Sequence, residues 1–274
     1  MGRHLRLQEP SRVAAGKAEA TAASVTRAGA VPLSDPPAEM ERVLAAAVSK
    51  NVSLRAIGGV AVHLRCPSAG QSPLMREYKD LDLVGRSGQG RTIDEMMIEL
   101  GYAPDREFNT LHGHRRLYFW DGTNERQLDV FIDKFEMCHP LPLKDRIEVD
   151  ERTLPLADLL LTKLQVVEVN EKDLKDASAL LADHDVSPEA IDATRIVSIL
   201  ADDWGWWRTS TENLTKVRDY ATSLAEWRDA SIVAGRVDTL LRTVADAPKS
   251  LKWKLRARVG ERLRWYDLPE EVDA

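Results

Sequence analysis

The stretch that decides the fold is Lys79-Asp80-Leu81-Asp82-Leu83-Val84, in which two carboxylates alternate with apolar residues. Alternate side chains of a β-strand share a face, so Asp80 and Asp82 point one way while the intervening leucines point the other. At ~3.3 Å per residue, the two aspartate Cα atoms lie roughly 6.6 Å apart, close enough to share a divalent ion or a pair of ions. Taken alone, such a pair is equally typical of a half-exposed structural strand.

Two further features surround this strand in the chain. Gly58 and Gly59 close a short apolar run upstream, and a second apolar strand downstream carries one carboxylate, Asp129, in Gln127-Leu128-Asp129-Val130-Phe131-Ile132. Asp129 alone would be an ordinary solvated strand residue. The order Gly-Gly, Asp-x-Asp and then a lone Asp in an apolar strand favours a functional site.

In this order of motifs the chain resembles the nucleotidyltransferase superfamily, whose fold is shared with DNA polymerase β. The pattern of that superfamily is Gly-Gly or Gly-Ser opening a helix, Asp-x-Asp on the next strand, and a third Asp on a later strand. The matching residues are Gly58, Gly59, Asp80, Asp82 and Asp129.

Three more segments resemble the abortive-infection toxin branch of the superfamily. Residues 76–83 are similar to its Arg-x-Ser/Thr-x-Asp-hydrophobic-Asp motif, with Tyr78 in place of the small hydroxyl residue. Leu161-Thr162-Lys163-Leu164 is similar to its helical Lys motif, and residues 171–176 to its Arg-Asp-x-x-Asp motif, with Lys172 where Arg is more common. The resemblance covers residues 40 to 185.

The resemblance implies transfer of a nucleoside monophosphate from a nucleoside triphosphate to a hydroxyl acceptor. Such a reaction depends mainly on positioning and charge neutralisation, and Mg²⁺ prefers hard oxygen ligands. Two Mg²⁺ ions are therefore expected at Asp80, Asp82 and Asp129, which would act in catalysis together with Lys163.

The resemblance also implies a nucleotide-binding set and an acceptor class. Gly58 and Gly59 would let the backbone approach the triphosphate, and Arg76 and Lys163 would bind the nucleotide. A tRNA or a protein is favoured as acceptor over a small molecule such as an aminoglycoside. The toxin branch further implies a bacterial, cytoplasmic protein with a cognate antitoxin as a partner.

Two function hypotheses of another kind stay open. One is a catalytically silent protein of the same fold that binds nucleotide, and the other is a toxin–antitoxin interaction protein that uses its helical part. Three retained carboxylates argue against the silent protein, because clustered negative charges are costly to keep without a function.

The chain has 274 residues, enough for two modest domains of an α+β protein. We expect an N-terminal disordered extension, a nucleotidyltransferase-type mixed sheet with flanking helices, and a C-terminal helical lobe, at residues 1–35, 36–153 and 154–274. In the last part, helices are expected near residues 172–183, 188–202, 211–229, 232–246 and 249–265.

Composition and charge narrow the class of protein. Two cysteines cannot form a disulfide framework, and no apolar stretch approaches a membrane span, so we expect a cytoplasmic protein without a membrane partner. The net charge of -6 means that any contact with nucleic acid must be local.

Three other groups of residues allow two interpretations each. His112, His114, Cys138 and His139 follow no familiar zinc spacing and are interpreted as loop and strand residues. Trp204, Trp206 and Trp207 are interpreted as core of the helical lobe, with base stacking as the alternative. The basic residues at 249–264 are interpreted as a solvated helix face, with RNA contact as the alternative.

Overall fold

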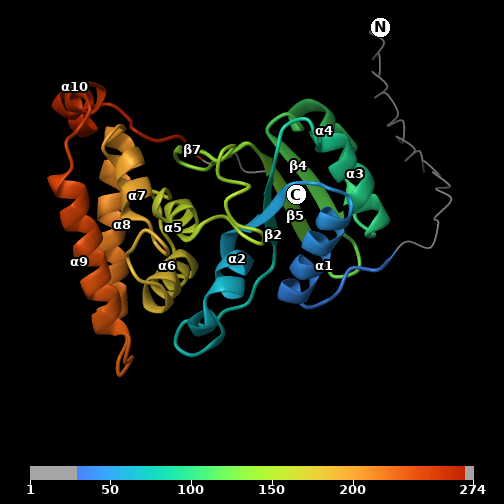
Figure 1. Cartoon of the computed structure of the whole chain (residues 1–274), viewed down its shortest axis with the longest axis horizontal. Coiled ribbons are helices and arrows are strands. Elements are labelled where there is room, and N and C mark those ends of the chain that lie inside the picture. Colours follow the sequence, from blue (N-terminus) through green and yellow to red (C-terminus); the bar gives the residue numbers. More distant parts are fainter. Residues whose placement is uncertain (1–29, 269–274) are drawn as a thin grey trace, which may run out of the picture.

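The computed structural model describes residues 30–268 and consists of a sheet with flanking helices followed by a helical part (Figure 1). This arrangement confirms the expected α+β fold class. The elements of the first part are α1 (Pro36–Ser49), β1 (Leu54–Ile57), α2 (Gly58–Arg65), the 3-10 helix η1 (Pro67–Gly70), β2 (Leu81–Gly85), α3 (Gly90–Glu99), β3 (Ala103–Pro104), α4 (Arg106–His112), β4 (Arg116–Asp121), β5 (Arg126–Ile132), β6 (Lys134–Glu136) and β7 (Pro140–Pro142). The helical part contains α5 (Leu156–Leu164), α6 (Glu171–Asp183), α7 (Ala193–Leu200), α8 (Trp204–Ser223), α9 (Ala230–Asp246), α10 (Leu251–Val259) and η2 (Gly260–Arg262).

The main sheet has five strands in the order β1-β2-β5-β4-β3. Strands β2 and β5 are parallel, and the other neighbours are antiparallel, which makes the sheet mixed. Asp82 pairs with Ile57 on one side and with Asp129 on the other. The end of β1, where α2 begins, therefore lies beside the two strand carboxylates.

The strands form where the apolar pattern requires them. Leu81 and Leu83 are fully buried, and Leu128 and Val130 on β5 are fully buried beside them. One face of the β2–β5 pair therefore packs against the core, and Asp82 and Asp129 lie on the other face.

The helical part joins the sheet through α5 and α6, both of which contact α2. All but one residue of α5 are buried, and the exception is Lys163. One cluster of buried apolar side chains runs from the sheet through α5 into α8 and α9. The division into a catalytic and a helical domain stays a prediction.

Several boundaries differ from the expected ones, and capping residues explain the differences. Helix α7 begins at Ala193 rather than at 188 because Asp192 caps its N-terminus. Helix α8 begins at Trp204 rather than at 211, because the Asp203 carboxylate accepts from two backbone N–H groups of the first turn. The last helix ends at Val259, before Gly260 with φ +59. Helix α4, the short strand β3 and the β6–β7 pair were not expected.

The N-terminal extension expected at residues 1–35 falls mostly outside the described residues. Its last part contacts the turn of the β4–β5 hairpin, where Arg126 donates to the Leu33 carbonyl at 2.7 Å and Asn124 to the Pro32 carbonyl at 3.2 Å.

The C-terminal segment, residues 263–268, returns from the helical part to the sheet part (Figure 1). The indole N–H of Trp265 donates to Oγ1 of Thr209 at 3.2 Å, and the backbone N–H of Asp267 donates to the Cys138 carbonyl at 3.0 Å. The segment therefore lies next to the end of the β4–β5 hairpin that is opposite its turn. Between residues 30 and 268, no helix has both the length and the apolar composition that a membrane crossing requires.

A buried aspartate fixes the position of α5. Asp158, in the first turn of α5, is fully buried and accepts from Arg146 and Arg195, each at 2.8 Å. Asp158→Ala leaves both guanidinium groups without their carboxylate and should lower the free energy of unfolding by about 3 kcal/mol. The control is Asp185→Ala, which breaks the exposed pair with Arg236 and should cost less than about 1 kcal/mol. Urea unfolding measures both, and equal losses would contradict this role of Asp158.

Candidate active site

Two of the three predicted carboxylates lie side by side on the sheet. Asp82 and Asp129 are direct partners in the parallel register of β2 and β5, so their side chains share a face. Asp80 precedes β2 by one residue and is exposed, whereas Asp82 is half-buried and Asp129 is 2% exposed. The structure thus brings together the sequence-predicted aspartates, with Asp80 at the solvent side.

The electrostatics of this face disfavour negative charge. Burial and the neighbouring charge of Asp129 raise the pKa of the Asp82 carboxyl to about 7. The pKa of Asp80 is also raised, again by burial first and then by Asp129. Lys163 and Arg116 act on Asp82 in the opposite direction without outweighing these effects. The face therefore has a shortage of positive charge that a bound cation would relieve.

Asp129 differs from the other two because both its oxygens have partners. Nε of Arg116 donates to Oδ1 at 2.7 Å, and Nε2 of Gln127 donates to Oδ2 at 2.6 Å. No group of three or more His, Cys, Asp or Glu side chains within residues 30–268 is arranged to hold an ion. In this arrangement the Arg116 guanidinium supplies the positive charge at Asp129.

The donor set is chemically suited to a hard divalent cation such as Mg²⁺. Asp80, Asp82 and Asp129 offer only carboxylate oxygens, and Mg²⁺ binds through one or two carboxylates plus water and substrate phosphate. Asp129 would join such a site by exchanging Arg116 for the cation.

Gly58 and Gly59 lie so close to neighbouring side chains that neither position has room for a Cβ atom. Gly58 has φ +69, and a Cβ added to it would lie 2.3 Å from Oδ2 of Asp82. A Cβ added to Gly59 would lie 1.8 Å from Nη2 of Arg76. The first turn of α2 is therefore pressed against the Asp82 carboxylate, with its free backbone N–H groups at the same edge of the sheet.

Arg76 and Lys163, both predicted to bind nucleotide, are held together by one carboxylate. The guanidinium of Arg76 donates to both oxygens of Asp176 at 2.9 and 2.8 Å. Nζ of Lys163 lies 2.8 Å from Asp176 and 3.2 Å from Asp173, and its side chain is 11% exposed. The guanidinium of Arg76 also lies over the ring of Tyr78, 4.4 Å from its centroid.

The pKa values of this cluster follow from charge pairing. Burial alone would raise the pKa of Asp176, but the charges of Lys163 and Arg76 outweigh it and lower that pKa. Burial alone would lower the pKa of Lys163, but Asp176 and Asp173 outweigh it and raise that pKa. The cluster is therefore charged at neutral pH.

Sequence reasoning assigned no role in the site to Asp173, Asp176, Arg116 or Gln127. It singled out the first two only as part of the motif at residues 171–176, although their spacing on α6 places them on one helix face. No comparable signal existed for Arg116, since its contact with Asp129 depends on the pairing of β4 with β5.

Within residues 30–268, His112, His114, Cys138 and His139 do not come together as a set of metal ligands. The ring of His112 lies 4.9 Å from that of Phe108, whereas Nε2 of His139 lies 2.9 Å from Oγ1 of Thr209. Burial lowers the pKa of His139 to about 4, so the ring is neutral. These contacts support the interpretation as structural residues.

The aromatic and basic groups of the helical part have the following positions. Trp204 and Trp206 are buried, as expected for core residues, and Trp207 is partly buried against the same core. Along α10, Lys252, Lys254 and Arg258 are exposed, as expected for a solvated face. The guanidinium of Arg256 lies over the ring of Trp204, 4.8 Å from its centroid.

Comparison with known proteins gives little similarity. No family model and no curated protein matches the sequence. Among solved structures, the chain is similar to the antibiotic-resistance factor ANT(2'')-Ia, with 14% identity over 75% of this chain and 92% of that one and a TM-score of 0.33. It is also similar to an antigenic nucleotidyltransferase-like protein from Paracoccidioides brasiliensis, with 10% identity over 80% and 96% of the two chains and a TM-score of 0.35. At these scores neither protein's function is assigned to this chain.

The close approach of Gly58 to Asp82 has a measurable consequence. Gly58→Ala adds a Cβ at positive φ and displaces the Asp82 carboxylate, whereas Gly88→Ala adds one at φ +86 with no atom within 4 Å. Both variants should lose about 1 kcal/mol from backbone strain, and Gly58→Ala should lose about 1–3 kcal/mol more. Thermal unfolding of the two variants measures the difference. Equal melting temperatures would show that the Asp82 contact is unimportant for stability.

The raised pKa of Asp82 predicts a pH-dependent effect of Asp82→Asn. A carboxyl whose folded pKa exceeds its unfolded pKa binds protons more tightly in the folded state, so stability falls as pH rises from about 4 to 7. Asp82→Asn should therefore change stability little near pH 4, stabilise the protein increasingly as pH rises, and reach about 1–3 kcal/mol at pH 8. Exposed Asp80→Asn is the control and should give a smaller gain. Stabilisation by Asp82→Asn at pH 5 as large as at pH 8 would contradict the assigned pKa.

Proposed function

We propose that this protein is a nucleotidyltransferase that moves a nucleoside monophosphate from a nucleoside triphosphate to a hydroxyl of an acceptor, which is a tRNA or a protein. The observation that carries the proposal is the register of β2 with β5. It sets Asp82 beside Asp129 at the edge of the sheet where the glycine-led helix α2 begins. The resemblance of the motifs supports the same assignment.

In the proposed reaction the acceptor hydroxyl oxygen attacks the α-phosphorus, and the bond to the pyrophosphate oxygen breaks. Asp80 and Asp82 would hold two Mg²⁺ ions, one of them shared with Asp129. When bound, these ions would neutralise phosphate charge and lower the pKa of the acceptor hydroxyl. The backbone of Gly58 and Gly59 has no side chain to keep a triphosphate away.

Lys163 would stabilise the negative charge that builds on the leaving pyrophosphate. Its ammonium is held by Asp173 and Asp176, and its charge acts on the Asp82 carboxyl, so it is fixed near the carboxylates. A lysine fixed in this way costs no reorganisation when the charge develops. Arg76, on the same Asp176, would position the triphosphate from the side of α2.

A second candidate is a protein of the same fold that binds nucleotide without transferring it. The observation that favours it is that Arg116 and Gln127 each donate to one oxygen of Asp129, so protein groups already compensate that carboxylate's charge.

A transfer assay tests the proposed function. The purified chain is incubated with each α-³²P-labelled nucleoside triphosphate, Mg²⁺ and either total RNA or total protein. Label should appear on one acceptor class, and Asp80→Asn and Asp82→Asn should each reduce transfer about 100-fold or more. Glu77→Gln removes an exposed carboxylate from the same segment and should not reduce transfer.

Thermal shift separates the two candidate functions. The triphosphate should raise the melting temperature with Mg²⁺ and much less in EDTA, because metal and phosphates supply ligands to each other. A shift with Mg²⁺ but no transfer to any acceptor would favour the silent protein. Equal shifts in Mg²⁺ and EDTA would contradict the metal site.

A further inference from the structure

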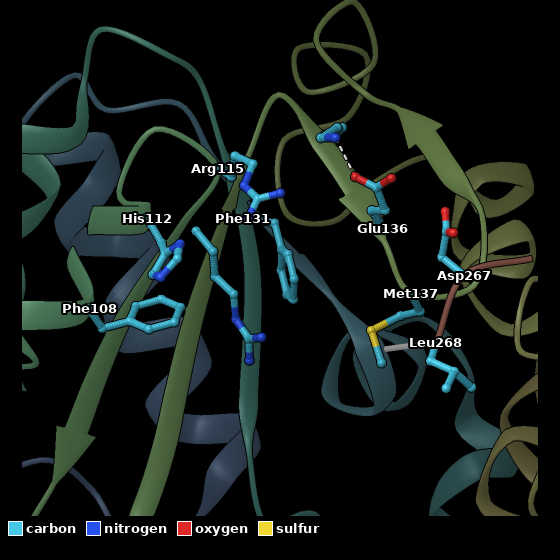
Figure 2. Close-up of a pocket in the computed structure, with 10 residues that line it drawn as sticks. Phe108, His112, Arg115, Phe131, Glu136, Met137, Asp267 and Leu268 are labelled. Atoms are coloured by element: carbon cyan, nitrogen blue, oxygen red, sulfur yellow. Dashed lines mark hydrogen bonds and ion pairs between the residues drawn. The ribbon is translucent and has the colours of Figure 1, made fainter. Parts of the chain in front are cut away.

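A pocket of about 320 Å³, whose lining residues are drawn in Figure 2, lies next to the pair of Arg116 with Asp129. Phe108 and His112 of α4 form one side of it, and Met137 and Leu268 form the other. The C-terminal segment therefore contributes to the wall opposite α4. The volume of the pocket is at the lower end of the range for small-ligand pockets.

Arg116 connects this pocket to the carboxylate site. Its side chain lines the pocket, and its Nε donates to Asp129 at 2.7 Å. Phe131, which also lines the pocket, follows Asp129 by two residues on β5 and so lies on the same face of the sheet. A molecule in the pocket would therefore lie next to Asp129, on the side away from β2.

An anionic group can bind in this pocket by exchange of ion-pair partners. The lining carries Arg115, Arg116 and Lys134 together with the carboxylates of Glu136 and Asp267. Lys134 pairs with Glu136, and Arg116 pairs with Asp129 behind the pocket, so an incoming anion would take the Arg116 guanidinium from Asp129. The two arginines adjoin Phe131, with the Arg116 guanidinium 5.1 Å from its ring centroid. Planar guanidinium groups bind phosphate in a bidentate manner. A polycation such as an amino sugar would instead meet two guanidinium groups.

The aromatic residues of the lining select for a flat ring. Phe108 and Phe131 both line the pocket (Figure 2), and the Arg116 guanidinium lies over the Phe131 ring. Aromatic side chains combined with cations are the usual means of holding a nucleobase and its phosphate.

We propose that this pocket binds one nucleotide unit of the acceptor, with its base against Phe108 and Phe131 and its phosphate at Arg115 and Arg116. The proposal rests on the proposed function, because it places the acceptor hydroxyl beside Asp129. It has one further consequence. A phosphate that engages Arg116 competes with Asp129 for that guanidinium, so the filled pocket frees the carboxylate for the metal site. Acceptor binding and metal binding then strengthen each other.

The test measures binding in EDTA, so that it does not depend on the metal site. Each of the four 5′-ribonucleoside monophosphates and a short single-stranded RNA with a free 3′-hydroxyl are titrated calorimetrically into the full chain. Phe108→Leu and Arg115→Gln should each weaken binding about tenfold. Arg91→Gln, which removes the same charge from an exposed helix position outside the pocket, should not weaken it. Circular dichroism verifies that each variant is folded.

The outcomes separate the sources of the ligand and the two proposals. Tighter binding of RNA than of any mononucleotide identifies an RNA end as the ligand, and equal binding identifies a free nucleotide; either result supports the pocket. Unchanged binding in both Phe108→Leu and Arg115→Gln, or no binding at all, overturns it. If a nucleotide binds the wild type and is weakened by both variants, but no transfer occurs, the pocket stands and the proposed function falls.

The coupling between nucleotide binding in the pocket and metal binding at the carboxylates is measured separately. Mn²⁺ titrated by electron paramagnetic resonance should bind more tightly when saturating pocket nucleotide is present. In Arg116→Gln, Asp129 has already lost the guanidinium, so Mn²⁺ should bind more tightly without nucleotide and nucleotide should add no further gain. A gain from nucleotide that is as large in Arg116→Gln as in the wild type would contradict the coupling through the pocket.

Discussion

The buried carboxylate of Asp176 holds the two parts of the molecule in register with the candidate site. It neutralises Arg76, from the segment before β2, and Lys163, from α5, within one cluster. Removing either cation would leave a buried charge only partly compensated, which is among the more costly defects a fold can carry. The position of α5 relative to β2 is therefore set by charge pairing as well as by the apolar core that surrounds it.

The sequence is informative where local geometry determines the result. The period of two in residues 79–84 placed Asp80 and Asp82 on one face, and the capping aspartates mark several helix starts that periodicity misplaced. In the sheet part, patterns within single segments predicted β1, β2, β4, β5 and the helices α1 to α3, but not the order of the strands. Helix α4 was missed because it buries no residue and so has no apolar stripe to reveal it.

The remainder depends on contacts between distant segments. Arg116 meets Asp129 only because β4 and β5 pair in one register, and a slip of one residue would place it on the opposite face. The pocket similarly requires the chain to return from α10 to the sheet. No local sequence pattern in residues 263–268 predicts that this segment contacts the sheet. Contacts of this kind are a property of the assembled fold, and they include the groups that adjust the charge of the candidate site.

The two ends of the described chain lie at opposite ends of the β4–β5 hairpin, and this determines how the protein can be attached to anything else. Residues 32 and 33 bind the hairpin turn, whereas Asp267 and Leu268 border the pocket at the other end. A fluorophore coupled to the variant Leu268→Cys would therefore sit at the pocket and report on any molecule that enters it. A fluorophore coupled to the variant Leu33→Cys would sit at the hairpin turn, at the far end of the hairpin from the pocket.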